Sequence, residues 1–124
     1  LRNDAIKASR WNMLNPGSEP RKSYLEKVLE NERGPFIAVS DNMRLVQDQI
    51  APWVPGGLTS LGTDGFGRSD TRQRLRRFFE VDAECIALGT LQALGRKGAI
   101  EMRTVAQAVK TLGVDPNKLY PYIV

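Results

Sequence analysis

A glycine-rich stretch, Gly62-Thr-Asp-Gly-Phe-Gly67, is the segment whose residue types and spacing could most readily bind a ligand. It follows a short apolar run and precedes a potential helix start. Free backbone N–H groups converge at such a junction and can hold an anion. Arg68 and Arg72, immediately downstream, would add positive charge. The chemistry in question is therefore the binding of a phosphate or another anion.

The spacing within this stretch argues against a phosphate site. It matches neither the dinucleotide fingerprint nor a phosphate loop with its Lys-Ser/Thr pair. The carboxylate of Asp64 would also repel phosphate unless a loop amide binds it. The residues alone favour a structural strand-to-helix turn, in which glycines supply positive φ angles and Phe66 fills the core.

An arginine-rich segment follows and could in principle bind a phosphate backbone. On a helix, positions 68, 72 and 76 would share one side, and positions 74 and 77 another. No recognition-helix or aromatic-stacking pattern accompanies them, so we expect a solvated face with ion pairs, some of them between chains, and no nucleic-acid partner. The arginines are Arg68, Arg72, Arg74, Arg76 and Arg77, and the acidic residues that could pair with them are Asp41, Asp48, Asp64, Glu80, Asp82 and Glu84.

The sequence offers little for catalysis. It has no histidine and one cysteine, so the commonest general base and the usual zinc ligands are missing. Cys85 lies in the first turn of an expected helix, where thiolate formation is favoured, but no base is visible near it, and we interpret it as a small buried residue. Asp41 and Asp64 both follow expected strands, and we interpret Asp41 as a helix cap. We predict no catalytic, cofactor-binding or metal-binding residue in this sequence.

The elements that must position these residues are read from apolar periodicity, caps and breakers. Residues 1–10 are expected to hold the end of a helix, and 11–20 a loop that packs Trp11, Met13 and Leu14 on the domain. The apolar tail 119–124 should lie against the body. In between, we expect two strands, 36–40 and 58–62. We expect a helix 18–32 capped by Ser18, and a helix 43–51 capped by Asp41 or Asn42, with Met43, Val46 and Ile50 facing inward. Three further helices follow: 71–79 capped by Ser69 or Asp70, 83–97 capped by Asp82, and 101–112 ended by Gly113.

Strand, helix and strand over residues 36–62 form a βαβ unit, which implies parallel strands. The chain of 124 residues, 41% hydrophobic, fits a single domain, 1–124. No run approaches the roughly 20 apolar residues of a membrane span, so no membrane association is expected. A single cysteine indicates a reducing, cytoplasmic setting. Because Leu1 is not a start methionine and no signal-peptide run follows it, we expect a piece of a longer protein.

Five segments resemble the C-terminal end of homodimeric bacterial pyruvate dehydrogenases, the decarboxylating first component of the pyruvate dehydrogenase complex. The run from Gly62 to Asp70 is specific for that family, whereas transketolases carry a looser Gly-x-Asp-x-Phe-Gly turn. The resemblance covers essentially the whole chain. The segments are Arg10-Trp-Asn-Met-Leu14, Pro35-Phe-Ile-Ala-Val-Ser-Asp41, Gln49-Ile-Ala-Pro-Trp-Val-Pro55, Leu61-Gly-Thr-Asp-Gly-Phe-Gly-Arg-Ser-Asp-Thr-Arg72 and Arg77-Phe-Phe-Glu-Val-Asp-Ala83.

The resemblance implies an α/β fold with three layers, like the C-terminal domain of transketolases. Residues 1–124 would form its last two-thirds, a truncated domain with a short parallel strand pair flanked by about five helices. If these residues are all there is, the 36–40 strand has an open edge that tends to pair with another chain.

The resemblance also implies the parent activity. The family uses thiamine diphosphate and magnesium to decarboxylate pyruvate, and passes the acetyl group to the lipoyl group of dihydrolipoyl acetyltransferase. Its cofactor ligands and catalytic groups lie in the two preceding domains, so none maps onto this sequence. We therefore expect a scaffold and dimer-contact domain that binds no cofactor itself. Two alternatives remain: a domain of another transketolase-type enzyme, and a stand-alone module that binds anions or nucleic acid.

Overall fold

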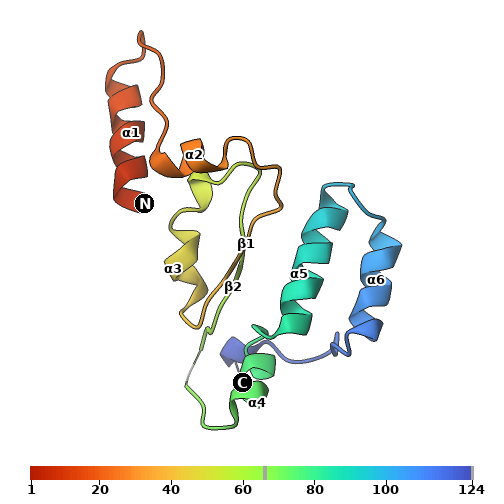
Figure 1. Ribbon diagram of the computed structural model, residues 1–124. Helices are drawn as coiled ribbons and strands as arrows, with labels where there is room; N and C mark the ends of the chain where they lie inside the picture. Colours follow the sequence, from red (N-terminus) through yellow and green to blue (C-terminus); the bar gives the residue numbers. More distant parts are fainter. Residues whose placement is uncertain (66, 124) are drawn as a thin grey trace.

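The computed structural model describes residues 1–65 and 67–123, apart from the side chain of Ile123. Figure 1 shows a helical N-terminal unit, a strand pair in the middle, and two long helices beyond it. None of the described helices is long and apolar enough to cross a membrane. The elements are α1 (Arg2–Leu14), α2 (Tyr24–Leu29), β1 (Ile37–Val39), α3 (Arg44–Asp48), the 3₁₀ helix η1 (Ala51–Trp53), β2 (Thr59–Leu61), α4 (Arg72–Phe78), α5 (Ala83–Arg96), α6 (Met102–Thr111) and the 3₁₀ helix η2 (Pro121–Ile123).

The two strands pair in parallel, as the βαβ interpretation predicts. Ile37 lies opposite Thr59, and Val39 lies opposite Leu61. Helix α3 forms part of the crossover between them, and α5 packs on both strands. In Figure 1, α3 and α5 lie on opposite sides of the strand pair, which gives the three layers. The expected α/β class and the parallel strand pair flanked by helices are confirmed.

Helices α5 and α6 form the most closely packed unit. A Cβ on Gly95 would lie 2.6 Å from the Met102 sulfur and 3.0 Å from Val105 Cγ2, so the two helices approach where α5 has no side chain. Asp82 caps α5 as predicted, since its Oδ1 accepts the Cys85 N–H at 3.0 Å. Gly113 ends α6 as predicted. The hydrophobic core of the described residues is small: Ala5, Val54, Phe79, Val81, Cys85 and Val105 are buried.

The N-terminal segment differs from its prediction. Helix α1 continues through residues 11–14, and Met13 and Leu14 are exposed rather than packed on the domain. The predicted helix 18–32 shrinks to α2, which is capped by the buried Ser23 and not by Ser18. The cause is a contact across the turn: Asn12 accepts the Arg21 N–H at 2.7 Å and donates to the Arg21 carbonyl at 2.9 Å. That pairing fixes the chain against α1 and delays the second helix.

Helix α3 differs in both its cap and its orientation. It begins after Met43 with no side-chain cap of its own, so the predicted caps Asp41 and Asn42 are wrong. The predicted inward residues Met43 and Val46 are 52% and 50% exposed, and Ile50 lies beyond the helix. The side chain that turns inward is a polar one, Gln47.

Gln47 explains the reversed face of α3. Its Nε2 donates to the carbonyls of Ala38 at 3.1 Å and Leu61 at 2.7 Å, and its Oε1 accepts the Ser40 hydroxyl at 2.7 Å. One amide thus ties α3 to both strands, and at Leu61 it adds a second hydrogen bond to a carbonyl that already accepts the Ser40 N–H at 3.2 Å. The apolar side of the helix is left facing outward.

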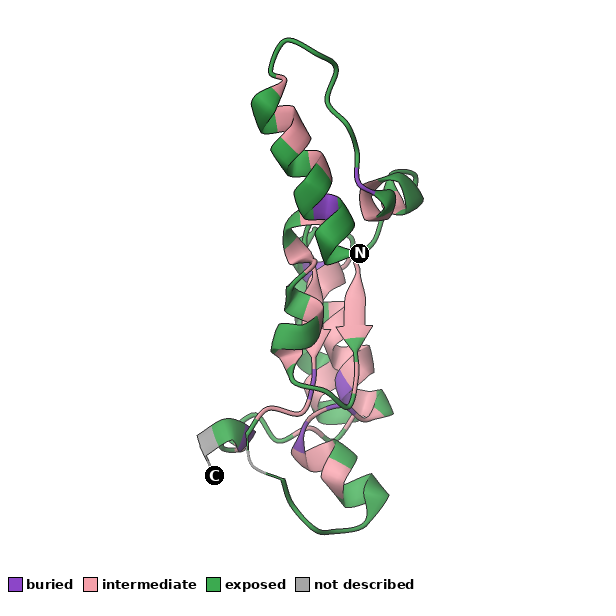
Figure 2. Cartoon of the chain, turned by 90° about the vertical axis from the view of Figure 1, so that its left-hand side faces the viewer, coloured by how far each residue is buried: buried purple, intermediate pink, exposed green. Residues whose placement is uncertain are grey.

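Two further details differ at α4 and at the C-terminus. Thr71 caps α4, because its hydroxyl accepts the Arg74 N–H, while Asp70 accepts the Thr71 N–H instead of capping. The tail lies against the body only in part: Pro121 is buried, but Leu119, Tyr120 and Tyr122 are exposed, as the green segment near the C-terminus in Figure 2 shows. The predicted core position of Phe66 lies outside the described residues.

Candidate functional site

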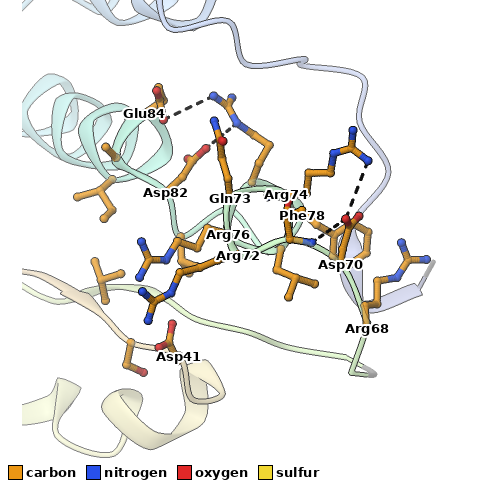
Figure 3. A pocket seen from close by; sticks show the side chains of 18 of the residues that line it. Asp41, Arg68, Asp70, Arg72, Gln73, Arg74, Arg76, Phe78, Asp82 and Glu84 are labelled. Atoms are coloured by element: carbon orange, nitrogen blue, oxygen red, sulfur yellow. Dashed lines mark hydrogen bonds and ion pairs between the residues drawn. The ribbon is translucent and has the colours of Figure 1, made fainter.

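The main hollow lies between the carboxyl end of β1, helix α4 and the first turn of α5, and has a volume of about 1670 Å³. We call it the arginine groove. Figure 3 shows arginine side chains of α4 extending into it, with Asp41, Asp82 and Glu84 contributed by neighbouring segments. Its basic residues are Arg68, Arg72, Arg74, Arg76, Arg77 and Lys118, its acidic residues are Asp41, Asp70, Asp82 and Glu84, and its apolar residues include Val39, Leu75, Phe78, Val81 and Ile86.

Some of these cations already have partners. Arg77 Nε lies 2.6 Å from an oxygen of Asp82, and Arg77 Nη2 lies 3.6 Å from Glu84. Arg74 pairs with Asp70 at 3.9 Å. The Arg68 guanidinium lies over the Phe78 ring, 4.1 Å from its centre.

The acidic residues expected to pair with the arginine segment therefore fall into two groups. Asp82 and Glu84 do pair with the arginine segment, as predicted. Four others do not form an ion pair with it among the described residues: Asp64 binds Arg44, Glu80 binds Lys118, Asp48 accepts the Ser60 hydroxyl, and Asp41 only faces the groove.

Hydrogen bonds from Cys85, together with the charge of Arg77, keep the α5 cap Asp82 ionised. Burial alone would raise the pKa of Asp82, but hydrogen bonds from Cys85 and the charge of Arg77 outweigh it, so the pKa lies below its usual range. The Asp82 carboxylate is ionised at neutral pH, and its negative charge interacts favourably with the positive end of the α5 helix dipole.

Lys118 was not singled out by the sequence. Its Nζ donates to the carbonyls of Arg77 at 2.8 Å and Phe78 at 2.6 Å, and pairs with Glu80 at 3.6 Å. It thereby satisfies carbonyls at the end of α4 from 40 residues away in sequence. No local pattern announces such a contact, since it depends on where the C-terminal segment returns.

The glycine stretch forms a joint that is packed at Gly62 and on one side of Gly65, while Gly67 is open and lines a hollow with Thr63 and Gly65. A Cβ on Gly62 would lie 2.5 Å from the Asn42 carbonyl oxygen and 2.9 Å from the Arg44 nitrogen. Gly65 has a φ of +100°, and the C-terminal segment lies behind it, with the Pro121 oxygen 3.3 Å from its would-be Cβ. The backbone at Gly62 and Gly65 is contacted by neighbouring chain, which supports the structural interpretation.

Asp64 is engaged, although not by a loop amide. Its Oδ1 accepts the Arg44 N–H at 3.0 Å, and its Oδ2 lies 3.5 Å from the buried Arg44 Nε. The carboxylate therefore serves the start of α3 in place of a local cap. Asp41 and Asp64 both lie near the carboxyl edge of the strand pair, but only Asp41 is directed into the groove.

Cys85 is buried and poorly suited to nucleophilic chemistry. Burial raises the pKa of its thiol to about 12, and the nearby Asp82 carboxylate adds to the effect. Burial thus overrides the advantage of a first-turn position. Among the described residues, no three His, Cys, Asp or Glu side chains gather closely enough to hold a metal ion.

Comparisons with known proteins identify the family. Residues 4–82 match the family model of the transketolase-like C-terminal domain. The chain is 49% identical to the pyruvate dehydrogenase E1 component of Pseudomonas aeruginosa, over 98% of this chain and 14% of that protein. It is 50% identical to the protein of the same name from Cupriavidus necator, over 90% of this chain and 12% of the relative.

The match extends to more distant bacteria. The pyruvate dehydrogenase E1 component of Escherichia coli is 39% identical over 98% of this chain and 14% of its own length. The chain thus spans about one-seventh of the length of these relatives. The family match includes both strands and α4, and the relatives extend it through α5 and α6. The chain belongs to the transketolase-like C-terminal domain family, in the form found in pyruvate dehydrogenase E1 components.

Proposed function

We propose that this chain is a scaffold and dimer-contact domain of a cytoplasmic pyruvate dehydrogenase that depends on thiamine diphosphate and magnesium. The parent would decarboxylate pyruvate and acetylate the lipoyl group of dihydrolipoyl acetyltransferase. The names of the relatives support this parent over another transketolase-type enzyme. No catalytic step is assigned to residues of this chain.

The side chains present do not fit the cofactor. A magnesium–diphosphate group requires oxygen ligands that converge on the metal. Asp64, the carboxylate of the glycine joint, is already bound to Arg44, and Gly62 packs against the Asn42 carbonyl. The described residues also hold no cluster of metal-binding side chains. We therefore infer that the cofactor binds to other parts of the parent.

The contact role rests on the exposed apolar side chains of helix α3. Met43, immediately before α3, and Leu45 and Val46 within it are all at least half exposed. β1 pairs only with β2 among the described residues, so its other edge is open. Exposed apolar side chains on a helix and an unpaired strand edge are each typical of a surface that another polypeptide covers.

Two measurements test the proposal. Thiamine diphosphate with magnesium should leave the melting temperature of the chain unchanged, and the chain should not decarboxylate pyruvate. The full-length Pseudomonas aeruginosa relative, measured in parallel, serves as the positive control. A clear cofactor-induced stabilisation of this chain would contradict the assignment of the cofactor site to other domains.

The contact role has its own test. Sedimentation velocity over two orders of magnitude in concentration should show that the chain self-associates. A stably folded chain that stays strictly monomeric would contradict the role even if the cofactor result held.

A further inference from the structure

We propose that the arginine groove docks an acidic, amphipathic segment of another polypeptide, whose carboxylates bind Arg72 and Arg76. This function is separate from the scaffold role, which concerns the outward face of α3. It assigns a partner chemistry to the arginine groove, which the scaffold role does not use.

Arg72 and Arg76 are the basic residues left available for a ligand. They lie one helical turn apart on α4, and both are exposed. Figure 3 shows their side chains extending together toward Asp41. Within residues 1–65 and 67–123 neither forms an ion pair, whereas Arg74 and Arg77 do. Two guanidinium groups at this spacing suit two carboxylates, because each can bind one through paired hydrogen bonds.

The shape of the site suits an extended segment. A second hollow of about 580 Å³ adjoins the groove and shares Asp41, Arg72 and Arg76 with it. It continues past Thr63 and Gly65 of the glycine joint. The two arginines therefore stand where two hollows meet, and a ligand that bound both hollows would be much longer than a single phosphate or carboxylate.

The lining favours a polypeptide over a nucleic acid. Leu75, Val81 and Ile86 supply apolar surface between the charges, which suits a segment that alternates acidic and apolar side chains. The aromatic ring in the groove, Phe78, is already covered by Arg68, so it is poorly placed to stack on a base.

The test uses a fluorescent eight-residue peptide that alternates aspartate and leucine, and follows its anisotropy with the intact chain at low salt. The double variant Arg72→Glu/Arg76→Glu should weaken binding about tenfold or more. The matched control is Arg103→Glu/Lys110→Glu, two exposed residues of α6 with the same change in net charge. It should bind the peptide nearly as well as the wild type.

A second variant keeps the test informative if charge reversal impairs folding. Asp41 faces the same two arginines and would compete with the ligand for them. Asp41→Asn should therefore tighten peptide binding several-fold. An aspartate–serine peptide should bind more weakly than the aspartate–leucine peptide, because it cannot use the apolar lining.

The proposal is overturned by any of three results. The first is no binding of the aspartate–leucine peptide at low salt. The second is equal weakening by the groove and control variants, which would indicate general charge attraction. The third is tighter binding of a single-stranded oligonucleotide of equal charge with the same dependence on Arg72 and Arg76, which would identify a nucleic-acid site.

Discussion

The α5–α6 pair and helix α3 are held in place by different kinds of contact. The α5–α6 pair buries apolar and small residues, with Val105 only 4% exposed and Gly95 against Met102. Helix α3 turns a polar residue, Gln47, toward the strands and leaves its apolar residues outside. The α5–α6 pair is joined by buried apolar contacts. Helix α3 is attached by hydrogen bonds, and its exposed apolar residues form the surface that we propose another chain covers.

Matched side-chain truncations in the α5–α6 pair and in α3 should give the largest difference in the free energy of unfolding. Val105→Ala removes two buried methyl groups from the α5–α6 interface and should lower the free energy of unfolding by about 2 kcal/mol. Val46→Ala removes the same groups from the exposed face of α3 and should change it by less than about 0.5 kcal/mol. Urea unfolding at low protein concentration measures both. Equal losses would show that the face of α3 is part of the core.

The attachment of α3 can be tested at Gln47. Gln47→Ala removes three side-chain hydrogen bonds, to Ser40, Ala38 and Leu61, and should cost about 1–2 kcal/mol in urea unfolding. Gln49→Ala, at the exposed end of the same helix, is the control and should cost little. If both variants unfold alike, the amide is not what holds α3 to the strands.

The α5 cap gives the α5–α6 unit a predictable response to acid. Because the pKa of Asp82 in the fold lies below its ordinary value of 3.8, its contribution to stability is present above that value and is lost as the pH falls through the folded pKa. Asp82→Asn keeps a good cap but cannot ionise, so its stability should fall less on acidification. Urea unfolding across a pH series, with Glu32→Gln as an exposed control, would show whether the slopes differ.

The smallest expected effect concerns the reactivity of the Cys85 thiol in the folded protein. With a thiol pKa of about 12, the native protein at pH 8 should react with a disulfide reagent only as fast as it unfolds. Adding denaturant should release one rapidly reacting thiol. Rapid reaction of the folded chain would mean that the start of α5 is open rather than packed.

The same contrast explains what the sequence could predict. Helices α5 and α6 follow local rules, the Asp82 cap and the Gly113 stop, which depend on residues within a few positions of one another. The parallel strand pair follows from two apolar runs with a helix between them, because such a crossover implies parallel strands. A pattern along the sequence can reveal both kinds of feature.

The failures lie where one side chain acts over a long sequence distance. Asp64 serves the start of α3 from 20 residues away, so Asp41 was wrongly favoured as the cap. Asn12 similarly holds Arg21 extended and delays α2.

The candidate site was predictable only as a list of arginines. Which of them pair, and which face a hollow with Asp41, depends on how α4 sits against the end of β1. That placement is a tertiary property, and periodicity along the segment does not specify it.

The central claim is that the apolar face of α3 is a contact surface and not part of the fold's own core. Sedimentation velocity of Leu45→Glu/Val46→Glu, beside the wild type and Gln49→Glu, tests it most directly. We expect the double variant to stay folded by circular dichroism while its self-association is lost, and the control to associate like the wild type. A double variant that associates as strongly as the wild type, or that unfolds as a monomer, would contradict the account.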